Sequence, residues 1–146
     1  MKTLSYSGRN LLLPLAGDTL IAFQETGLTG LVFADEEAVR SLIEFEDELQ
    51  ITDVDGSRTL RGTKPGAGFW RADLERLDYL LGYRLMSAIA RHDGCLTLEF
   101  ETGARLEVQS TTGYEAWHFQ CPLPQTSTKQ HPISVYGDHG KLIISS

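Results

Sequence analysis

The clearest pattern in the chain is DGCLTLEFETGARLEV, which occupies residues 93–108. Apolar residues alternate with threonine and glutamate over residues 96–100, and the alternation resumes over residues 106–108. This period of two is typical of antiparallel strands that bury one face. The pairs Asp93-Gly94 and Thr102-Gly103 suit the turns between such strands. We therefore expect the second half of the chain to form a β-meander, whose first strand runs from Tyr83 to about Arg91.

Short strands are also expected on both sides of the meander, because brief apolar runs are separated there by glycine and proline. In the run that follows the meander, Trp117 and Phe119 share one face and are expected to lie in the core. The expected ranges are residues 11–15, 19–24 and 28–33 before the meander, and residues 114–120, 133–136 and 142–145 after it.

A second alternating region covers residues 43–51, with glutamates between the apolar residues. Asp47-Glu48 divides it, so the region predicts a hairpin with one apolar and one acidic face. Asp55-Gly56 then predicts another tight turn. The region echoes residues 98–108, which is consistent with two similar hairpins in one domain. It is equally consistent with the likeness that any two acidic amphipathic hairpins share.

Two short helices are expected among the strands. One begins at Asp35, whose carboxylate can accept hydrogen bonds from free N–H groups. The other covers residues 73–81, with Asp73 as its cap and Gly82 as its stop. The pattern as a whole predicts an α+β fold in a single domain spanning residues 1–146, with antiparallel hairpins and one or two short helices.

The composition is that of an ordinary globular domain, with 41% hydrophobic and 23% charged residues. The formal net charge is −7. A charge of this sign repels nucleic acid and anionic lipid, so neither a nucleic acid nor a membrane is expected as a partner. It favours a basic partner, although the simpler interpretation is that it keeps a small protein soluble.

Cysteine use and hydropathy both favour a cytoplasmic protein. Cys95 and Cys121 are the only cysteines, which is fewer than a secreted disulfide scaffold of this size usually has. We interpret them as buried, reduced thiols, and the sequence does not tell whether they lie near each other. The apolar run at residues 11–16 is too short for a signal-peptide core or a membrane span.

No motif for a cofactor, a metal or a nucleophile stands out. The four histidines lack metal-binding spacing, and the sequence has no nucleophile elbow, phosphate-binding loop or dinucleotide fingerprint. Asp53-Val54-Asp55-Gly56 resembles a calcium loop only superficially, and we interpret it as a turn. We therefore expect no cofactor, no metal and no catalytic residue.

Paired carboxylates leave one catalytic alternative open. Glu44 with Glu46, and Glu99 with Glu101, stand two residues apart on expected strands, a separation of roughly 6.5–7 Å. A small carboxylate and histidine enzyme would need Glu99, Glu101 and His118 to converge in a pocket. The simpler interpretation is that these carboxylates lie on solvated strand faces.

Carboxylates crowd into residues 35–48, where Arg40 is the only basic residue. Like charges on neighbouring strand positions are slightly destabilising, so the cluster calls for an explanation. A basic protein partner would supply one through electrostatic complementarity. The candidate partner-binding residues are Asp35, Glu36, Glu37, Glu44, Glu46, Asp47 and Glu48.

A second motif follows the meander, where residues 114–117 read Tyr-Glu-Ala-Trp and Gly140 precedes an apolar run at residues 142–144. With the meander pattern, these motifs make the chain resemble DUF6188, a family of small bacterial domains of unknown function. The resemblance covers residues 77–145 well, residues 40–60 loosely and the first forty residues not at all. It implies no catalytic residues. Domains of this sort are similar to the immunity proteins encoded beside polymorphic bacterial toxins.

The leading hypothesis is therefore a non-enzymatic, cytoplasmic immunity protein. It would bind and neutralise a cognate toxin domain, such as a basic nuclease, of the contact-dependent inhibition or type VI secretion type. Electrostatic steering by the acidic residues would assist the binding. The alternatives are the small carboxylate and histidine enzyme, and a structural module that self-associates through its sheet edges.

Overall fold

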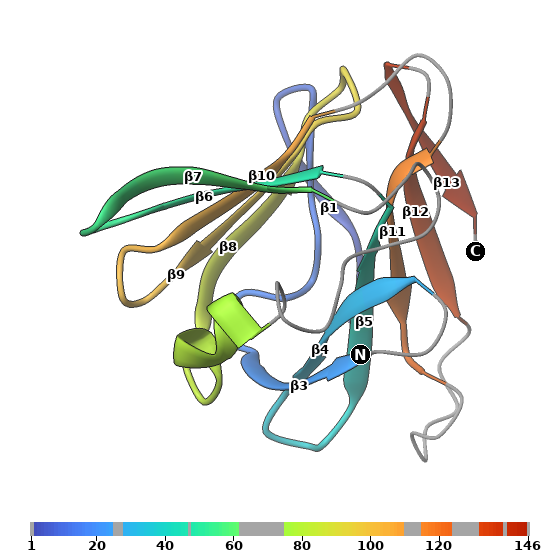
Figure 1. Cartoon of the computed structure of the whole chain (residues 1–146). Coiled ribbons are helices and arrows are strands. Elements are labelled where there is room, and N and C mark those ends of the chain that lie inside the picture. Colours follow the sequence, from blue (N-terminus) through green and yellow to red (C-terminus); the bar gives the residue numbers. More distant parts are fainter. Residues whose placement is uncertain are drawn as a thin grey trace.

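The alternating pattern of the sequence becomes strand along most of the described chain. The computed structural model describes residues 2–24, 28–46, 48–61, 75–109, 115–123, 132–138 and 140–145. In this part of the chain, thirteen strands form two antiparallel sheets, and a single 3₁₀ helix, η1 (Glu75–Leu80), stands before the second half (Figure 1).

The two sheets differ in the segments that they combine. The first sheet has seven strands, in the spatial order β1 (Ser5–Ser7), β2 (Asn10–Leu12), β8 (Leu85–Ala90), β9 (Leu96–Phe100), β10 (Arg105–Val108), β6 (Glu48–Asp53) and β7 (Gly56–Arg61). The second sheet has six strands, in the order β13 (Lys141–Ser145), β12 (Ile133–Asp138), β11 (Glu115–Cys121), β5 (Arg40–Phe45), β4 (Thr29–Ala34) and β3 (Thr19–Gln24).

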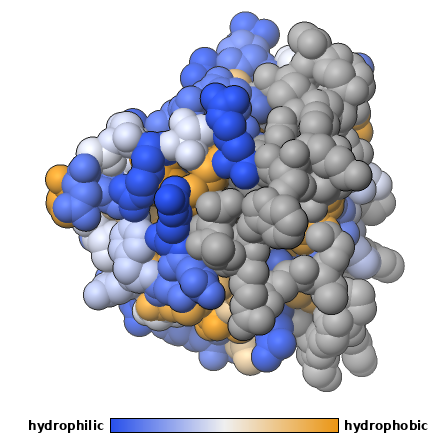
Figure 2. Space-filling view, in the orientation of Figure 1, coloured by the Kyte–Doolittle hydropathy of each residue, from blue (hydrophilic) through white to orange (hydrophobic). Residues whose placement is uncertain are grey.

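One hydrophobic core lies between the sheets and draws buried side chains from both of them. The meander β8–β9–β10 is confirmed, with its alternating residues at β9 buried on one face and exposed or half-buried on the other. Trp117 and Phe119 of β11 are fully buried, as expected. On the side seen in Figure 2, hydrophilic residues cover most of the described surface, and hydrophobic residues are exposed only in small groups.

The predicted α+β class is wrong, because the described chain is almost entirely β. Where a helix was expected, the chain makes the tight turn that joins β4 to β5. The Asp35 Oδ1 atom does accept N–H groups, from Glu37 and Val39, both at 2.9 Å. Ala38 turns back with φ at 63°, and the residues after it pair with β4 and β11. Asp35 therefore accepts backbone N–H groups as expected, but it does so in a turn. The residues after the turn pair with a strand on each side and form β5 instead of a helix.

The second expected helix is reduced to η1. Its Leu77 and Leu80 side chains are buried, and Gly82 ends the segment with φ at 87°, the left-handed conformation that suits a stop. The expected cap, Asp73, lies outside the described residues.

The predicted hairpin over residues 43–51 is also wrong. β5 belongs to the six-stranded sheet and β6 to the seven-stranded sheet, so the chain crosses between sheets after Phe45. At the crossing, the Glu46 N–H donates to the Ala116 carbonyl at 3.2 Å. Strand alternation is the same whichever neighbour a strand pairs with, which is why the sequence could not distinguish a crossing from a hairpin. The expected turn at Asp55-Gly56 is confirmed between β6 and β7.

The two thiols occupy different environments and neither forms a disulfide. Cys95 is half-buried in the turn before β9, and its Sγ lies 3.3 Å from Gln109 Oε1. Cys121 ends β11 and is buried, which raises the pKa of its thiol.

Trp117 links the two sheets by a directional contact. Its indole Nε1–H donates to the Gly94 carbonyl at 2.7 Å, which joins β11 of one sheet to the β8–β9 turn of the other. Gly137 on β12 lies against the same indole, and a Cβ there would overlap Trp117 Nε1 and stand 2.5 Å from the Gly94 oxygen. A glycine is therefore required at position 137 for the indole to reach its acceptor.

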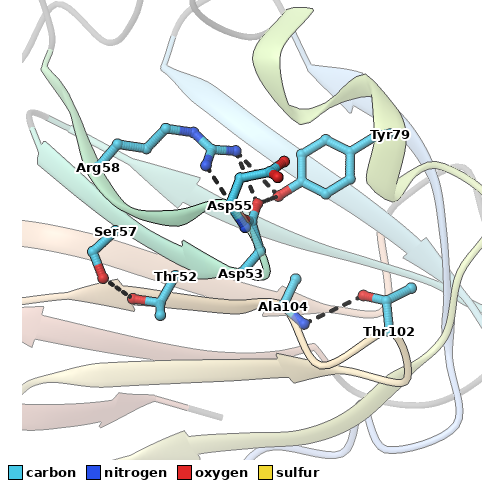
Figure 3. A network of polar contacts seen from close by, with 8 residues as sticks. All are labelled: Thr52, Asp53, Asp55, Ser57, Arg58, Tyr79, Thr102 and Ala104. Carbon is cyan, nitrogen blue, oxygen red and sulfur yellow. Dashed lines mark hydrogen bonds and ion pairs between the residues drawn. The ribbon is translucent and has the colours of Figure 1, made fainter.

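A second polar network fastens η1 to the β6–β7 hairpin (Figure 3). The Tyr79 hydroxyl donates to Asp53 Oδ2 at 2.5 Å, and Arg58 Nη2 donates to the same oxygen at 2.9 Å. These hydrogen bonds lower the pKa of Asp53 to about 2, and the one from Arg58 has the largest effect. Burial, and then the hydrogen bond to Asp53, raise the pKa of Tyr79 to about 12. The helical turn is thus held by a carboxylate that stays ionised and a phenol that stays protonated.

We expect Gly137→Ala to destabilise the protein through overlap with the indole, by about 1–3 kcal/mol in urea unfolding. Trp117→Phe should cost about 1–3 kcal/mol, since it leaves the Gly94 carbonyl without its donor. In the Trp117→Phe background, Gly137→Ala should cost less, because part of the obstructing ring is gone. Gly8→Ala, in an open turn, is the control and should cost the same in both backgrounds. Full additivity of Gly137→Ala with Trp117→Phe would contradict the proposed contact.

We expect the Tyr79 phenol to ionise near pH 12 rather than near the usual value of about 10. The measurement is absorbance at 295 nm, taking wild type minus Tyr79→Phe, with near-ultraviolet circular dichroism to follow folding. Because the folded-state pKa is raised, this phenol's stabilisation is present below pH 10 and is lost as the pH rises through 12. Asp53→Asn should lower the midpoint only partly, since burial is the larger cause. A wild-type midpoint near 10 would refute the network.

Candidate functional site

Three of the acidic residues singled out in the sequence lie together beside a hollow of about 350 Å³. The N-terminal segment, the β2–β3 connection and the β4–β5 turn form its walls. We call it the acidic hollow, and its lining residues are Lys2, Ala16, Gly17, Asp18, Asp35, Glu36 and Glu37.

Lys2 and Asp18 form the floor of the acidic hollow. The Lys2 Nζ atom donates to Asp18 Oδ2 at 2.5 Å and to the Pro14 carbonyl at 2.8 Å. The two side chains are only 12% and 4% exposed. Burial raises the pKa of Asp18, although the hydrogen bond from Lys2 opposes the shift. The loss of hydration at this carboxylate is therefore only partly offset by its partner.

Asp35, Glu36 and Glu37 form the rim. Asp35 is fixed by the turn that it stabilises, and its Oδ2 lies 3.8 Å from Lys2 Nζ. Glu36 and Glu37 are exposed to solvent. Among the described residues, the acidic hollow is thus lined by four carboxylates and the one ammonium group of Lys2, an excess of negative charge that suits the guanidinium or ammonium group of a ligand.

Asp18 and Lys2 were missed by the sequence reasoning. Gly17-Asp18 has the composition of an ordinary turn, and the local sequence gives no sign that the carboxylate is buried. Lys2 lies sixteen residues away from Asp18 in the chain. Only the return of β4 and β5 to the N-terminal segment brings the charges of the two regions together.

The other acidic candidates are not part of the acidic hollow. Glu44 lies four residues along β5 from Arg40, roughly 13 Å at the usual rise of a strand. Glu46 is half-buried at the crossing between the sheets, and Glu48 lies in the other sheet, 3.9 Å from Arg61. Asp47 falls outside the described residues. The seven carboxylates are therefore close in sequence but do not make one surface.

Glu44 belongs instead to a row of residues that crosses the whole six-stranded sheet on its outer face. Its Oε1 lies 3.3 Å from His118 Nδ1, and its Oε2 accepts a hydrogen bond from Gln24 Nε2 at 2.9 Å. The His118 ring stacks on Tyr136, with 4.1 Å between centroids. In strand order from β3 to β13, the row consists of Gln24, Gly30, Glu44, His118, Tyr136 and Ile143.

The glycine in this row allows Gln24 to reach Glu44 across an intervening strand. A Cβ at Gly30 would stand 2.6 Å from Leu42 Cδ1 and 3.4 Å from the Cβ of Gln24. The Glu44 and His118 side chains are only 16% and 12% exposed. Glu44 and His118 therefore form a largely buried polar pair within this row, and Glu44 does not lie on the solvated strand face that the sequence suggested.

The catalytic alternative required Glu99, Glu101 and His118 to converge, and they do not. Glu99 is exposed on the outer face of the seven-stranded sheet, 3.5 Å from Arg105. Glu101 is exposed in the next turn and accepts the Arg84 N–H at 2.7 Å. His118 lies on the outer face of the opposite sheet. The two glutamates and the histidine are separated by the core.

Within the described ranges, no three histidine, cysteine, aspartate or glutamate side chains are placed to hold a metal ion. No helix in the same part of the chain has the length and hydropathy needed to cross a membrane.

Comparison with known proteins gives one match. A family model described as "Family of unknown function (DUF6188)" matches residues 12–126. The match begins earlier than the expected resemblance and ends before β12 and β13. No curated protein and no solved structure matches the chain. Since the matched segment covers more than half of its length, the chain belongs to the DUF6188 family of unknown function.

Proposed function

We propose that this chain is an immunity-type binding protein, which neutralises a toxin domain by holding a basic side chain of that domain in the acidic hollow. The observation that carries the proposal is that four carboxylates and the Lys2 ammonium are the charged groups lining the hollow among the described residues. The family description names no activity, and the support for the proposal is this site together with the resemblance to immunity proteins.

The charge balance of the acidic hollow favours a cationic ligand over a neutral one. Asp18 is paired with Lys2 yet keeps a raised pKa because it is buried. A guanidinium group entering the hollow would bring further positive charge to Asp18 and Asp35 and could form paired hydrogen bonds with a carboxylate. Glu36 and Glu37 at the exposed rim would act mainly on the association rate, through steering that salt weakens.

The net charge of −7 supports the same class of partner. A chain of this charge attracts a basic protein, such as a nuclease domain, from a distance of about one Debye length, roughly 8 Å at physiological ionic strength. Binding of this kind blocks the toxin by occupying its surface, and it needs no turnover by the inhibitor.

The test is the affinity for the purified product of the neighbouring upstream gene, measured by calorimetry and by protection of cells that express it. Glu36→Lys/Glu37→Lys reverses the rim and should weaken binding about tenfold or more. It should also flatten the dependence of affinity on salt between 0.05 and 0.5 M, values chosen to span about 14 to 4 Å of Debye length.

The matched control is Asp55→Lys/Glu99→Lys, which makes the same change in net charge at exposed positions of the seven-stranded sheet. It should leave binding and protection close to wild type. Equal losses in both variants would show that only overall charge matters and would remove the acidic hollow from the proposal. Absence of both a complex and protection with the wild-type chain would overturn the proposed function itself.

A further inference from the structure

Among the strands that the structure describes, the two sheets have four edge strands, and these differ in how well they are protected against pairing with another chain. β1 is only three residues long and polar. β7 carries Arg58 and Arg61 along its length. Short length and charged side chains are both recognised means of discouraging edge-to-edge association.

β3 is protected in another way. It has a bulge between Leu20 and Ala22, and its outer side is hydrogen-bonded to the segment after η1. Leu20 N–H donates to the Tyr83 carbonyl at 3.0 Å, and Gly82 N–H donates to the Leu20 carbonyl at 2.9 Å. Bulges and covering segments make an edge unsuitable as a template for another strand.

β13 has none of these protections over Leu142–Ser145. Within the part of the chain that the structure describes, it pairs with β12 on one side and with nothing on the other. Ile143 and Ile144 are 40% and 42% exposed, on opposite faces of the strand. An edge that combines unpaired backbone groups with apolar side chains on both faces is suited to strand addition.

Charge decides what kind of strand would fit this edge. Residues 133–145 contain one acidic residue, Asp138, and one basic residue, Lys141, in a chain whose net charge is −7. A basic partner would gain no attraction at this neutral strip. A second copy of the chain could approach here without setting carboxylates against carboxylates, which it could not do at the acidic hollow.

We propose that β13 is a self-association edge, where two copies of this chain pair antiparallel about a two-fold axis at Ile143. In this register Ile143 meets its own counterpart on the outer face, and Leu142 meets Ile144 on the inner face. Lys141 lies opposite Ser145, so the two ammonium groups are kept apart. An isologous contact of this kind closes at a dimer and joins the two six-stranded sheets into one.

The contact is short, so the dimer should be weak. Five residues at the usual rise give a shared edge of about 17 Å. A contact along so short an edge buries less area than the roughly 1,000 Å² of a stable interface, so we expect dissociation in the high micromolar range. Because the paired strip is neutral, 0.5 M salt, where the Debye length is only about 4 Å, should not weaken the association.

The test is sedimentation velocity of the purified full chain at concentrations up to about 1 mM, a level at which a dimer of high micromolar affinity is mostly formed. Ile143→Lys places two like charges opposite each other at the axis and should abolish the dimer. Ile21→Lys is the matched control, since Ile21 is also 40% exposed and lies on β3, the other edge strand of the same sheet. It should leave the dimer intact, as should Lys141→Glu.

Ile144→Lys is a second disrupting variant, so a failure of Ile143→Lys to fold would not leave the question open. A wild-type chain that stays monomeric at 1 mM would overturn the proposal, and so would a dimer that Ile21→Lys dissociates and Ile143→Lys does not. The experiment uses the chain alone, so its outcome is separate from that of the toxin-binding test.

Discussion

The indole hydrogen bond of Trp117 is the contact on which the relation between the two sheets depends. The core between the sheets is apolar, and apolar packing has no preferred direction. The hydrogen bond from Trp117 Nε1 to the Gly94 carbonyl does have a preferred direction, and it fixes β11 against the β8–β9 turn. Gly137 on the neighbouring strand provides the space for it. The neighbouring strands β11 and β12 are thereby held at one point with the β8–β9 turn of the other sheet.

Much of this architecture could be predicted from the sequence, because strand alternation is a local property. The meander, the core positions of Trp117 and Phe119 and the turn at Asp55-Gly56 all follow from local patterns, and all are confirmed. The pairing of β5 and β6 with strands of different sheets could not be predicted. Which sheet a strand joins depends on contacts with residues far away in the chain. Those contacts do not change the alternation of apolar and polar residues along the strand.

The candidate site likewise combines features that could be predicted from the sequence with features that could not. Asp35 was recognised as an acceptor of backbone N–H groups, and it has that role, but in a hairpin turn and not in a helix. Glu44 was expected on a solvated strand face, but the strand register places its carboxylate in contact with Gln24 and His118. Lys2 and Asp18 carried no local signal at all. Clustering in sequence therefore identified the charge of the proposed binding surface but not its shape.

A rigid connection between the sheets matters for both proposed surfaces, since the acidic hollow and the β13 edge are built from separate parts of one body. The most direct measurement is hydrogen exchange of the Trp117 indole N–H by nuclear magnetic resonance, with Trp70→Phe to assign the two tryptophan signals. If the bond to Gly94 holds the sheets together, this hydrogen should exchange only on global unfolding. Its exchange free energy should then equal the free energy of unfolding measured in urea. Exchange through local opening, with a much smaller free energy, would contradict the central role given to this contact.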